Sequence, residues 1–135
     1  MRIYVDTSGF IALASRKDRN HAASEEFLRA SLEEGHRFVT GKNVLIEYVD
    51  GLTKRASKKE AIRQLDSILS STFLLIEEVR EEDWSLGMDY FRRYYDKAID
   101  LTDSLSFAIM ERLKIDTAFA FDRDFEVHGF VVLPS

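Results

Sequence analysis

The sequence predicts an α/β protein in which a mainly parallel central sheet lies between two layers of helices. Short apolar runs typical of buried strands alternate along the chain with amphipathic segments typical of helices. Strands separated by helices pair in parallel, because the helical crossover returns the chain to the end of the sheet from which it started. No internal repeat and no Pro/Gly/Ser-rich linker divides the 135 residues. We therefore expect residues 1–135 to form a single domain.

The first part of the chain is expected to contain two strands and four helices. Apolar runs predict strands at residues 2–5 and 36–40. Helical periodicity predicts helices over residues 8–16, 21–35, 43–55 and 57–71. The hydroxyls of Thr7 and Ser8 can cap the first helix, and Asn43 can cap the third. Ser57, with Glu60 three residues later, has the pattern of a capping box at the start of the fourth.

The second part continues the alternation. Strands are predicted at residues 72–77, 117–121 and 130–134, and helices over residues 81–95 and 101–114. No element is predicted between the last two strands, where the segment FDRDF has the composition of a polar turn. The expected architecture is therefore a three-layer α/β/α arrangement.

Composition narrows the classes of function. The absence of cysteine excludes disulfides and thiolate metal sites. A net charge of −5, from 19 basic and 24 acidic residues, lacks the positive excess that marks most nucleic-acid binders. No apolar run approaches the ~18 residues needed to cross a bilayer, and the amino terminus has the pattern of a strand, not of a signal peptide. We expect a cytoplasmic protein without membrane contact, whose contact with nucleic acid would need local basic patches or a bound cation.

Acidic residues follow the ends of predicted strands or begin the helices after them. Asp6 ends the first strand, and Asp122 and Asp124 follow the strand at 117–121. Glu47 and Asp103 lie on the inner sides of helices that begin above the same edge of the sheet. Reactive groups in open parallel sheets gather just beyond the carboxyl ends of the strands. These acids can therefore converge.

Each acid also has a purely structural interpretation. Asp6 can be a turn or cap residue, and Asp103 can face the helix dipole, with Asp100 as the cap. Glu47 can be solvated, and Asp122 can belong to a polar turn. As a group they favour another explanation, because two carboxylates about 5 Å apart repel by roughly 3 kcal/mol at an effective dielectric constant of 20. A cluster needs a cation or raised pKa values, and hard oxygen ligands suit Mg²⁺ or Mn²⁺.

The chain resembles a known family. Four segments in order are similar to the PIN-domain ribonucleases, particularly the VapC-type toxins of prokaryotic toxin–antitoxin pairs: IYVDTSGFIAL, NVLIEYVDGL, LTDSLSFAIM and TAFAFDRDFEVHGF. The resemblance covers nearly the whole chain. It implies a PIN-like fold and hydrolysis of RNA phosphodiesters by a water activated by one or two Mg²⁺ or Mn²⁺ ions.

The resemblance also implies a set of site residues. The catalytic, metal-holding acids of the family fall on Asp6, Glu47, Asp103 and Asp122, and Ser8 would assist through its hydroxyl or a bound water. Two further acids are ambiguous. Asp100 stands where similar sequences often carry Ser, so it either adds a carboxylate or caps the helix. Asp124 is either an additional ligand or a turn residue, ranked below Asp122.

Basic residues are candidates for RNA binding, and the histidines are expected to have no catalytic role. RNA would need cations near the acids, and the candidates are Arg16, Lys17, Arg19, Lys42 and Arg123. The segment KRASKK at 54–59 is interpreted as a solvated face. The three histidines, at positions 21, 36 and 128, are expected to be surface or structural residues.

Three alternative functions share parts of the pattern. A haloacid-dehalogenase-like phosphatase also begins with a strand-end Asp but needs a second Asp at the position of Ser8. A phospho-receiver domain would present two adjacent early acids and a late Lys, and neither is found. A catalytically silent PIN-like module that serves protein contact would keep the acids, and only RNA cleavage distinguishes it from an enzyme.

Protein partners are also expected. The helices over 43–55 and 57–71 carry more apolar residues than packing on a sheet requires: Val44, Leu45, Ile46, Tyr48, Val49, Leu52, Ile62, Leu65, Ile68 and Leu69. Deep burial within one domain is the alternative explanation. The family resemblance implies a homodimer and an antitoxin protein that covers helices near the acids, with a basic side chain among the carboxylates.

Overall fold

The computed structural model describes residues 1–135 and contains one sheet of five parallel strands. The strand order is β3-β2-β1-β4-β5. The strands are β1 (Arg2–Val5), β2 (Arg37–Gly41), β3 (Leu74–Glu77), β4 (Thr117–Phe119) and β5 (Val131–Leu133). Every pairing between neighbouring strands is parallel. The α/β class predicted from the sequence is confirmed.

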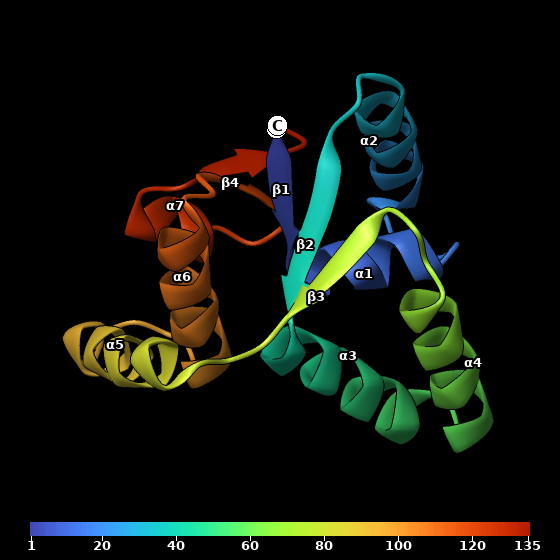
Figure 1. Cartoon of the computed structure of the whole chain (residues 1–135). Helices are drawn as coiled ribbons and strands as arrows, with labels where there is room; N and C mark the ends of the chain where they lie inside the picture. Colours follow the sequence, from blue (N-terminus) through green and yellow to red (C-terminus); the bar gives the residue numbers. More distant parts are fainter.

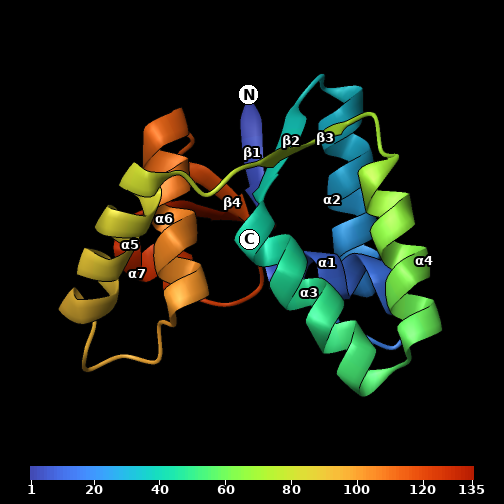
Figure 2. The same ribbon diagram turned by 60° about the horizontal axis from the view of Figure 1, so that its bottom comes forward.

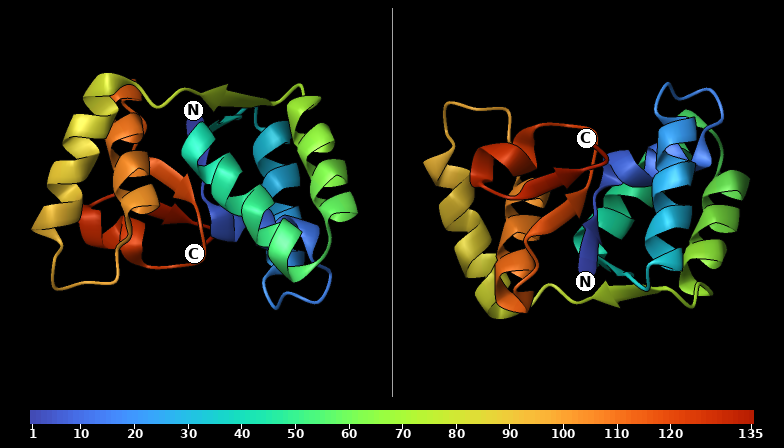
Figure 3. Two further views of the ribbon diagram at one scale, coloured as in Figure 1. Left: turned by 90° about the horizontal axis from the view of Figure 1, so that it is seen from below. Right: turned by 90° about the horizontal axis from the view of Figure 1, so that it is seen from above.

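Seven helices connect the strands and lie on both sides of the sheet. They are α1 (Thr7–Ala14), α2 (His21–Glu33), α3 (Lys42–Arg55), α4 (Lys58–Leu69), α5 (Glu81–Arg93), α6 (Leu101–Leu113) and α7 (Asp124–His128). Figures 1 and 3 show α1 to α4, in blue to green, on one side and α5 to α7, in yellow to red, on the other. None of these helices combines the length and the apolar character required of a membrane span.

The central strands are buried on both faces. Ile3, Tyr4 and Val5 of β1 are all buried, as are Phe38 and Val39 of β2. This continuous burial explains why the strands are apolar runs without alternation, because helices cover the sheet from two sides. The outer strands β3 and β5 are only partly covered.

The order of the strands places the topological switch point of the sheet between β1 and β4, and we call the region beyond the carboxyl ends of these two strands the crevice. From β1 the chain moves outward through β2 to β3 and then crosses to the other side of β1 to form β4 and β5. In register, Tyr4 pairs with Ala118 and Val5 with Phe119, and the backbone N–H of Asp6 donates to the Phe119 carbonyl at 3.1 Å. Ligands of open α/β sheets bind at such a switch point, beyond the carboxyl ends of the strands. Asp6 therefore stands where this fold class places its chemistry.

Two predicted caps were wrong. Helix α1 begins at Thr7 and is capped by Asp6, not by the Thr7 and Ser8 hydroxyls. Helix α3 begins at Lys42 after Gly41, so Asn43 lies inside the helix and caps nothing. Gly41 is required there, because a Cβ atom would lie 2.1 Å from the Asn43 Oδ1 atom. Other predicted caps are confirmed, since Ser57 accepts from the Glu60 backbone and Asp100 accepts from the Asp103 backbone.

One helix was missed. The segment after β4 was interpreted as a polar turn without an element, but Asp124–His128 forms α7. A helix of five residues is shorter than two turns, so its sequence cannot show a 3.6-residue period. Its burial depends on a single anchor, the fully buried Phe125.

Candidate active site

Asp6 is held at the end of β1 by its own helix and by the loop after β4. Its side chain caps α1, and Ser8 donates to it through the hydroxyl at 2.8 Å and through the backbone N–H at 3.4 Å. The Ser8 hydroxyl also accepts from the backbone N–H of Phe121 at 3.0 Å. Asp6 is only 2% exposed. The strand-end aspartate is thus both a helix cap and a buried carboxyl in the crevice.

Asp103 reaches the same place from the first turn of α6. Asp100 caps this helix and accepts from the Asp103 backbone N–H at 2.9 Å. Asp103 is 8% exposed, and the residues that follow it in α6 from Ser104 to Met110 are all buried. The burial of α6 forces its first acid into a water-poor setting.

Asp122 and Asp124 come from the loop between β4 and α7. The backbone N–H of Asp124 donates to the Asp122 side chain at 3.1 Å, which is an Asx turn that starts the helix. Both side chains are partly buried. The predicted polar turn therefore exists, but it also begins α7.

The acids are close enough to alter one another's protonation. Burial, followed by the charge of Asp122, raises the pKa of Asp6 to about 7. Burial, followed by the charges of Asp6, Asp100 and Asp122, raises the pKa of Asp103 to about 9. Burial also raises the pKa of Asp124, whose carboxyl lies within hydrogen-bonding reach of Asp103. The structure thus brings together Asp6, Asp103, Asp122 and Asp124, with Asp100 beside them.

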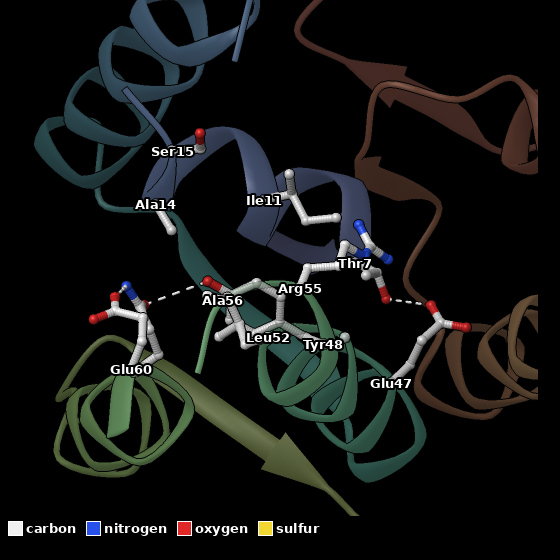
Figure 4. A pocket seen from close by; sticks show the side chains of 12 residues that line it. Thr7, Ile11, Ala14, Ser15, Glu47, Tyr48, Leu52, Arg55, Ala56 and Glu60 are labelled. Carbon is white, nitrogen blue, oxygen red and sulfur yellow. Dashed lines mark hydrogen bonds between the residues drawn. The ribbon is translucent and has the colours of Figure 1, made fainter. Parts of the chain in front are cut away.

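Glu47 lies at the margin of this group. The Thr7 hydroxyl donates to its Oε1 atom at 2.5 Å, which ties α3 to the first turn of α1. Figure 4 shows this bond at one end of a pocket of about 340 Å³ between α1, α3 and α4. Glu47 does not feature among the charges that shift the pKa values of Asp6 or Asp103. It is therefore a neighbour of the aspartates and not a member of their tightest cluster.

The acidic side chains of the site can be compared with the ligands that a metal ion requires. No three His, Cys, Asp or Glu side chains converge on a single point as a preformed binding site. Instead the carboxyls act on one another, because burial is followed by Asp122 among the causes that raise the pKa of Asp6, and Asp124 is among those that raise the pKa of Asp103. Pairs of this kind share protons that a cation would displace, and a site with only oxygen donors suits Mg²⁺ or Mn²⁺. The chemistry of the donors fits such an ion.

The predicted RNA-contacting cations fall into two groups. Arg16, Lys17 and Arg19 are exposed in the segment between α1 and α2 and make no ion pair. Lys42 and Arg123 are occupied, since Lys42 pairs with Glu78 at 2.6 Å and Arg123 with Glu126 at 3.5 Å. Arg16, Lys17 and Arg19 are therefore more available than Lys42 and Arg123 to bind a polyanion.

The histidines are structural, as predicted. His128 is almost buried, stacks on Phe107 with 4.4 Å between the ring centroids, and bonds to Glu111 and Tyr94 at 2.7 Å each. His21 bonds to the Ala12 carbonyl at 2.8 Å, and His36 bonds to the amino terminus.

Sequence reasoning missed two polar residues of the site. Thr7 was considered only as a cap, yet its hydroxyl holds Glu47. Asn43 donates to the Thr102 carbonyl at 2.9 Å and to the Ser106 hydroxyl at 3.0 Å, which joins α3 to α6. Both contacts join residues at least 40 positions apart. The only sequence signal was position, since Thr7 directly follows Asp6 and Asn43 lies about one helical turn before Glu47.

Known proteins are similar to this chain over nearly its whole length. Residues 3–131 match the PIN domain. The 23S rRNA-specific endonuclease VapC20 of Mycobacterium tuberculosis is 30% identical over 129 residues, which cover 96% of this chain and 95% of the relative. The crystal structure of Mycobacterium tuberculosis VapC20, described as a sarcin–ricin loop cleaving toxin, aligns with a TM-score of 0.86 at 28% identity over 96% of each chain.

Two further solved structures share the fold at lower identity. VapBC2 from Rickettsia felis, bound to a DNA fragment from its promoter, aligns with a TM-score of 0.71 at 16% identity, over 98% of this chain and 97% of that one. FitAcB from Neisseria gonorrhoeae aligns with a TM-score of 0.69 at 13% identity, over 99% and 97%. The match over residues 3–131 and the 30% identity to VapC20 confirm the family inferred from the sequence motifs, and the two structures of lower identity share its fold. The chain belongs to the PIN-domain family of metal-dependent ribonucleases, and within that family to the VapC-type toxins.

Proposed function

We propose that this ribonuclease works at the crevice between β1 and β4, with Asp6, Asp103 and Asp122 as the residues that hold Mg²⁺ or Mn²⁺. The observation that carries the proposal is that carboxyls from three distant parts of the sequence lie close enough to act on one another, with pKa values raised at Asp6 and Asp103. Such an arrangement destabilises the protein unless a cation or protons neutralise it. Asp124 is a further candidate ligand, as is Glu47.

The proposed reaction is hydrolysis of an RNA phosphodiester. When bound, the ion supplies positive charge to the scissile phosphate and an acidified water as nucleophile. The chain's own residues keep the acids in position: Ser8 orients Asp6, and Asp100 fixes the first turn of α6 beneath Asp103. Thr7 occupies one oxygen of Glu47, which leaves the other available as a ligand or proton acceptor.

The metal dependence can be tested on the purified protein. RNA cleavage should require Mg²⁺ or Mn²⁺ and should stop in EDTA. An ion that binds only the folded state adds about 2.7 kcal/mol of stability at a hundred times its dissociation constant, so the melting temperature should rise with millimolar Mn²⁺. No change in melting temperature would contradict the metal site, and no cleavage under any condition would favour a catalytically silent module.

We infer that the substrate is ribosomal RNA and that the enzyme meets it in the cytoplasm. The support is the 30% identity to a relative named as a 23S rRNA-specific endonuclease. Ribosomes incubated with the protein should give one dominant cut in 23S rRNA by primer extension, and the Asp103→Asn variant should give none. Cleavage of transfer RNA with intact 23S rRNA would redirect the proposal to another RNA class.

The pocket of Figure 4 is the proposed site of an antitoxin segment. Its walls are partly apolar, since Ile11 of α1 and Leu52 of α3 both line it, and Glu47 lies at one end. An apolar segment with a basic side chain would fill the walls and place its charge beside Glu47 and Asp6. Ile11→Arg should abolish inhibition by the antitoxin while RNA cleavage persists, and inhibition of the unchanged protein should weaken as Mg²⁺ rises.

A homodimer is proposed through the surface formed by Ile46, Val79 and Trp84. Of the apolar residues expected to form a second surface, Val44, Leu45, Tyr48 and Ile68 are buried, whereas Ile46, Ile62 and Leu69 are exposed. Ile46 is 61% and Trp84 42% exposed, and both line one hollow together with Lys42, Glu78, Arg80 and Glu81. An apolar centre with charges of both signs suits a two-fold, self-complementary contact. Light scattering should give a dimer at tens of micromolar, and Trp84→Glu should give a monomer.

A further inference from the structure

Arg55 is an unpaired cation that lines the same two hollows as Glu47. It lies in the last turn of α3, within the segment 54–59 that the sequence suggested was a solvated face. Among the cations of this region, Lys42 is paired with Glu78 and Arg123 with Glu126. Arg55 is exposed and has no carboxylate within ion-pairing distance. Its charge is therefore available to a ligand.

The helix holds the Arg55 guanidinium back toward the site. Gly51 lies one turn before Arg55 on α3, and a Cβ atom at Gly51 would be 3.4 Å from a terminal nitrogen of the guanidinium. The bare backbone of Gly51 thus provides the surface on which the Arg55 side chain lies. Glu47 lies one turn earlier on the same face. Figure 4 shows Arg55 directed toward the end of the pocket where Thr7 bonds to Glu47.

Arg55 also separates two hollows. One is the pocket of about 340 Å³ between α1, α3 and α4, and the other, of about 430 Å³, extends from α3 to Thr102. Glu47, Gly51 and Arg55 line both. Thr102 immediately precedes Asp103, so the second hollow leads to the start of α6. An extended strand that crosses the aspartates can therefore pass along the guanidinium.

The charge balance of the protein indicates a function for Arg55. The chain carries a net charge of −5, and the crevice is lined by carboxyls, so it repels a polyanion. A guanidinium offers a planar pair of donors that matches a phosphate, and it remains charged at every working pH. We propose that Arg55 binds a backbone phosphate of the RNA next to the scissile bond and so positions the strand over the aspartates. This role rests on the proposed use of the crevice for RNA cleavage.

The test compares Arg55→Ala and Arg55→Lys with the matched control Arg37→Ala. Arg37 starts β2, at the opposite edge of the sheet from the acids, and its replacement changes the net charge equally. Binding of a fluorescent single-stranded RNA is followed by anisotropy in EDTA over a range of salt concentrations. Loss of one phosphate contact should reduce the slope of log K against log salt by about 0.7. Arg55→Ala should show this reduction, Arg55→Lys should keep the slope with weaker binding, and Arg37→Ala should match the parent.

Cleavage kinetics supply the second readout. In Mn²⁺, Arg55→Ala should raise KM about tenfold with a smaller change in kcat, because the contact is made in the ground state as well as in the transition state. An unchanged salt slope and KM would overturn the proposal, as would an equal effect of Arg37→Ala. A variant that loses only antitoxin binding would assign Arg55 to the protein partner instead. Failure of the parent protein itself to cleave RNA would be a separate result, which would contradict the proposed function of the crevice and not the role of Arg55 in binding RNA.

Discussion

Ser8 donates a hydrogen bond of 2.8 Å to the carboxylate of Asp6, and the same hydroxyl accepts the backbone N–H of Phe121 at 3.0 Å. One side chain thereby joins the end of β1 to the loop that carries Asp122. The bond to Ser8 also lowers the pKa of Asp6, against the larger effect of burial. Ser8 therefore favours the ionised form of Asp6, which is the form that can hold a cation.

Ser8→Ala should weaken both the fold and the site. The Phe121 N–H would lose its acceptor in a partly buried setting, which costs about 1–3 kcal/mol. Asp6 would hold its proton more tightly, so more Mn²⁺ should be needed for half-maximal cleavage. Urea unfolding and an Mn²⁺ titration of cleavage measure the two effects. Ser8→Thr keeps the hydroxyl and is the control. If Ser8→Ala had the stability and Mn²⁺ response of the parent, the bridge would have no role.

Asp6→Asn and Asp103→Asn should abolish RNA cleavage and leave the fold intact. Each replaces a buried acid by a neutral side chain of the same shape and removes a group whose ionisation the crevice disfavours. The metal-free variants should therefore melt at or above the temperature of the parent at pH 8, and Mn²⁺ should no longer raise it. Circular dichroism melts and an RNA cleavage assay provide the data. Cleavage at the parental rate by either variant would remove that residue from the catalytic set.

The metal-free protein should lose stability as the pH rises. The pKa values of Asp6 and Asp103 are raised in the folded state, to about 7 and about 9, so between pH 4 and pH 9 the folded state binds more protons than the unfolded state. Stability then falls with increasing pH across this window. Each tenfold difference in proton affinity is worth about 1.4 kcal/mol.

The measurement is the melting temperature in EDTA at pH 5 and at pH 8. A decrease of several degrees is expected at the higher pH, with a smaller decrease for Asp103→Asn. The stabilising effect of Mn²⁺ should be larger at pH 8 than at pH 5, because protons compete less strongly for the carboxylates at the higher pH. A melting temperature that is constant or rises with pH would show that the acids do not share protons in this way.

Asp83 supports the helices that carry the site without belonging to it. It is 1% exposed and accepts three hydrogen bonds of 2.9 to 3.1 Å from Arg112, which joins α5 to α6. Removing one partner of a buried ion pair typically costs about 3–5 kcal/mol. Asp83→Ala should therefore lower the free energy of unfolding by about this amount in urea, while folded protein in the cold keeps its Mn²⁺ requirement. Stability within 1 kcal/mol of the parent would show that Arg112 finds sufficient partners in Glu77 and solvent.

The parts of this protein that could be predicted from sequence depend on local pattern and on a general rule of topology. The buried strand β1 is an unbroken apolar run, and an acid directly after it must lie at the carboxyl edge of a parallel sheet. The same reasoning located Asp122 after β4, and helical position located Asp103 near the start of α6. The structure brings these three acids together, while their roles in catalysis remain a proposal.

Other features depend on contacts between distant parts of the chain. The bond from Thr7 to Glu47 joins residues 40 positions apart, and no periodicity reveals it. Lys42 was predicted to meet RNA, but its pairing with Glu78 requires the end of β3 to lie beside the start of α3. From the sequence, Arg55 was assigned to a solvated face. Its position near the crevice depends on the packing of α3 against α1, which the sequence pattern does not show. Figure 2 shows α3 extending from the end of the strands along α1.

The bond between Thr7 and Glu47 provides a final prediction. The Thr7 hydroxyl lies 2.5 Å from one carboxylate oxygen of Glu47 and links α1, which begins after Asp6, to α3. Thr7→Val preserves the shape of the side chain and removes only the donor. Glu47 would then be free to leave the margin of the crevice, and kcat/KM should fall about tenfold, a loss that corresponds to about 1.4 kcal/mol.

A double-mutant cycle separates this effect from a general loss of stability. In a Glu47→Ala background the hydroxyl has no carboxylate to hold, so Thr7→Val should change kcat/KM by less than about twofold. The interaction energy from the cycle should then be about 1 kcal/mol, within the range found for residues in contact. Equal effects of Thr7→Val in both backgrounds would mean that Thr7 acts on RNA cleavage independently of Glu47. Such a result would leave Glu47 without the neighbour that positions it, and its assignment to the site would rest on the family resemblance alone.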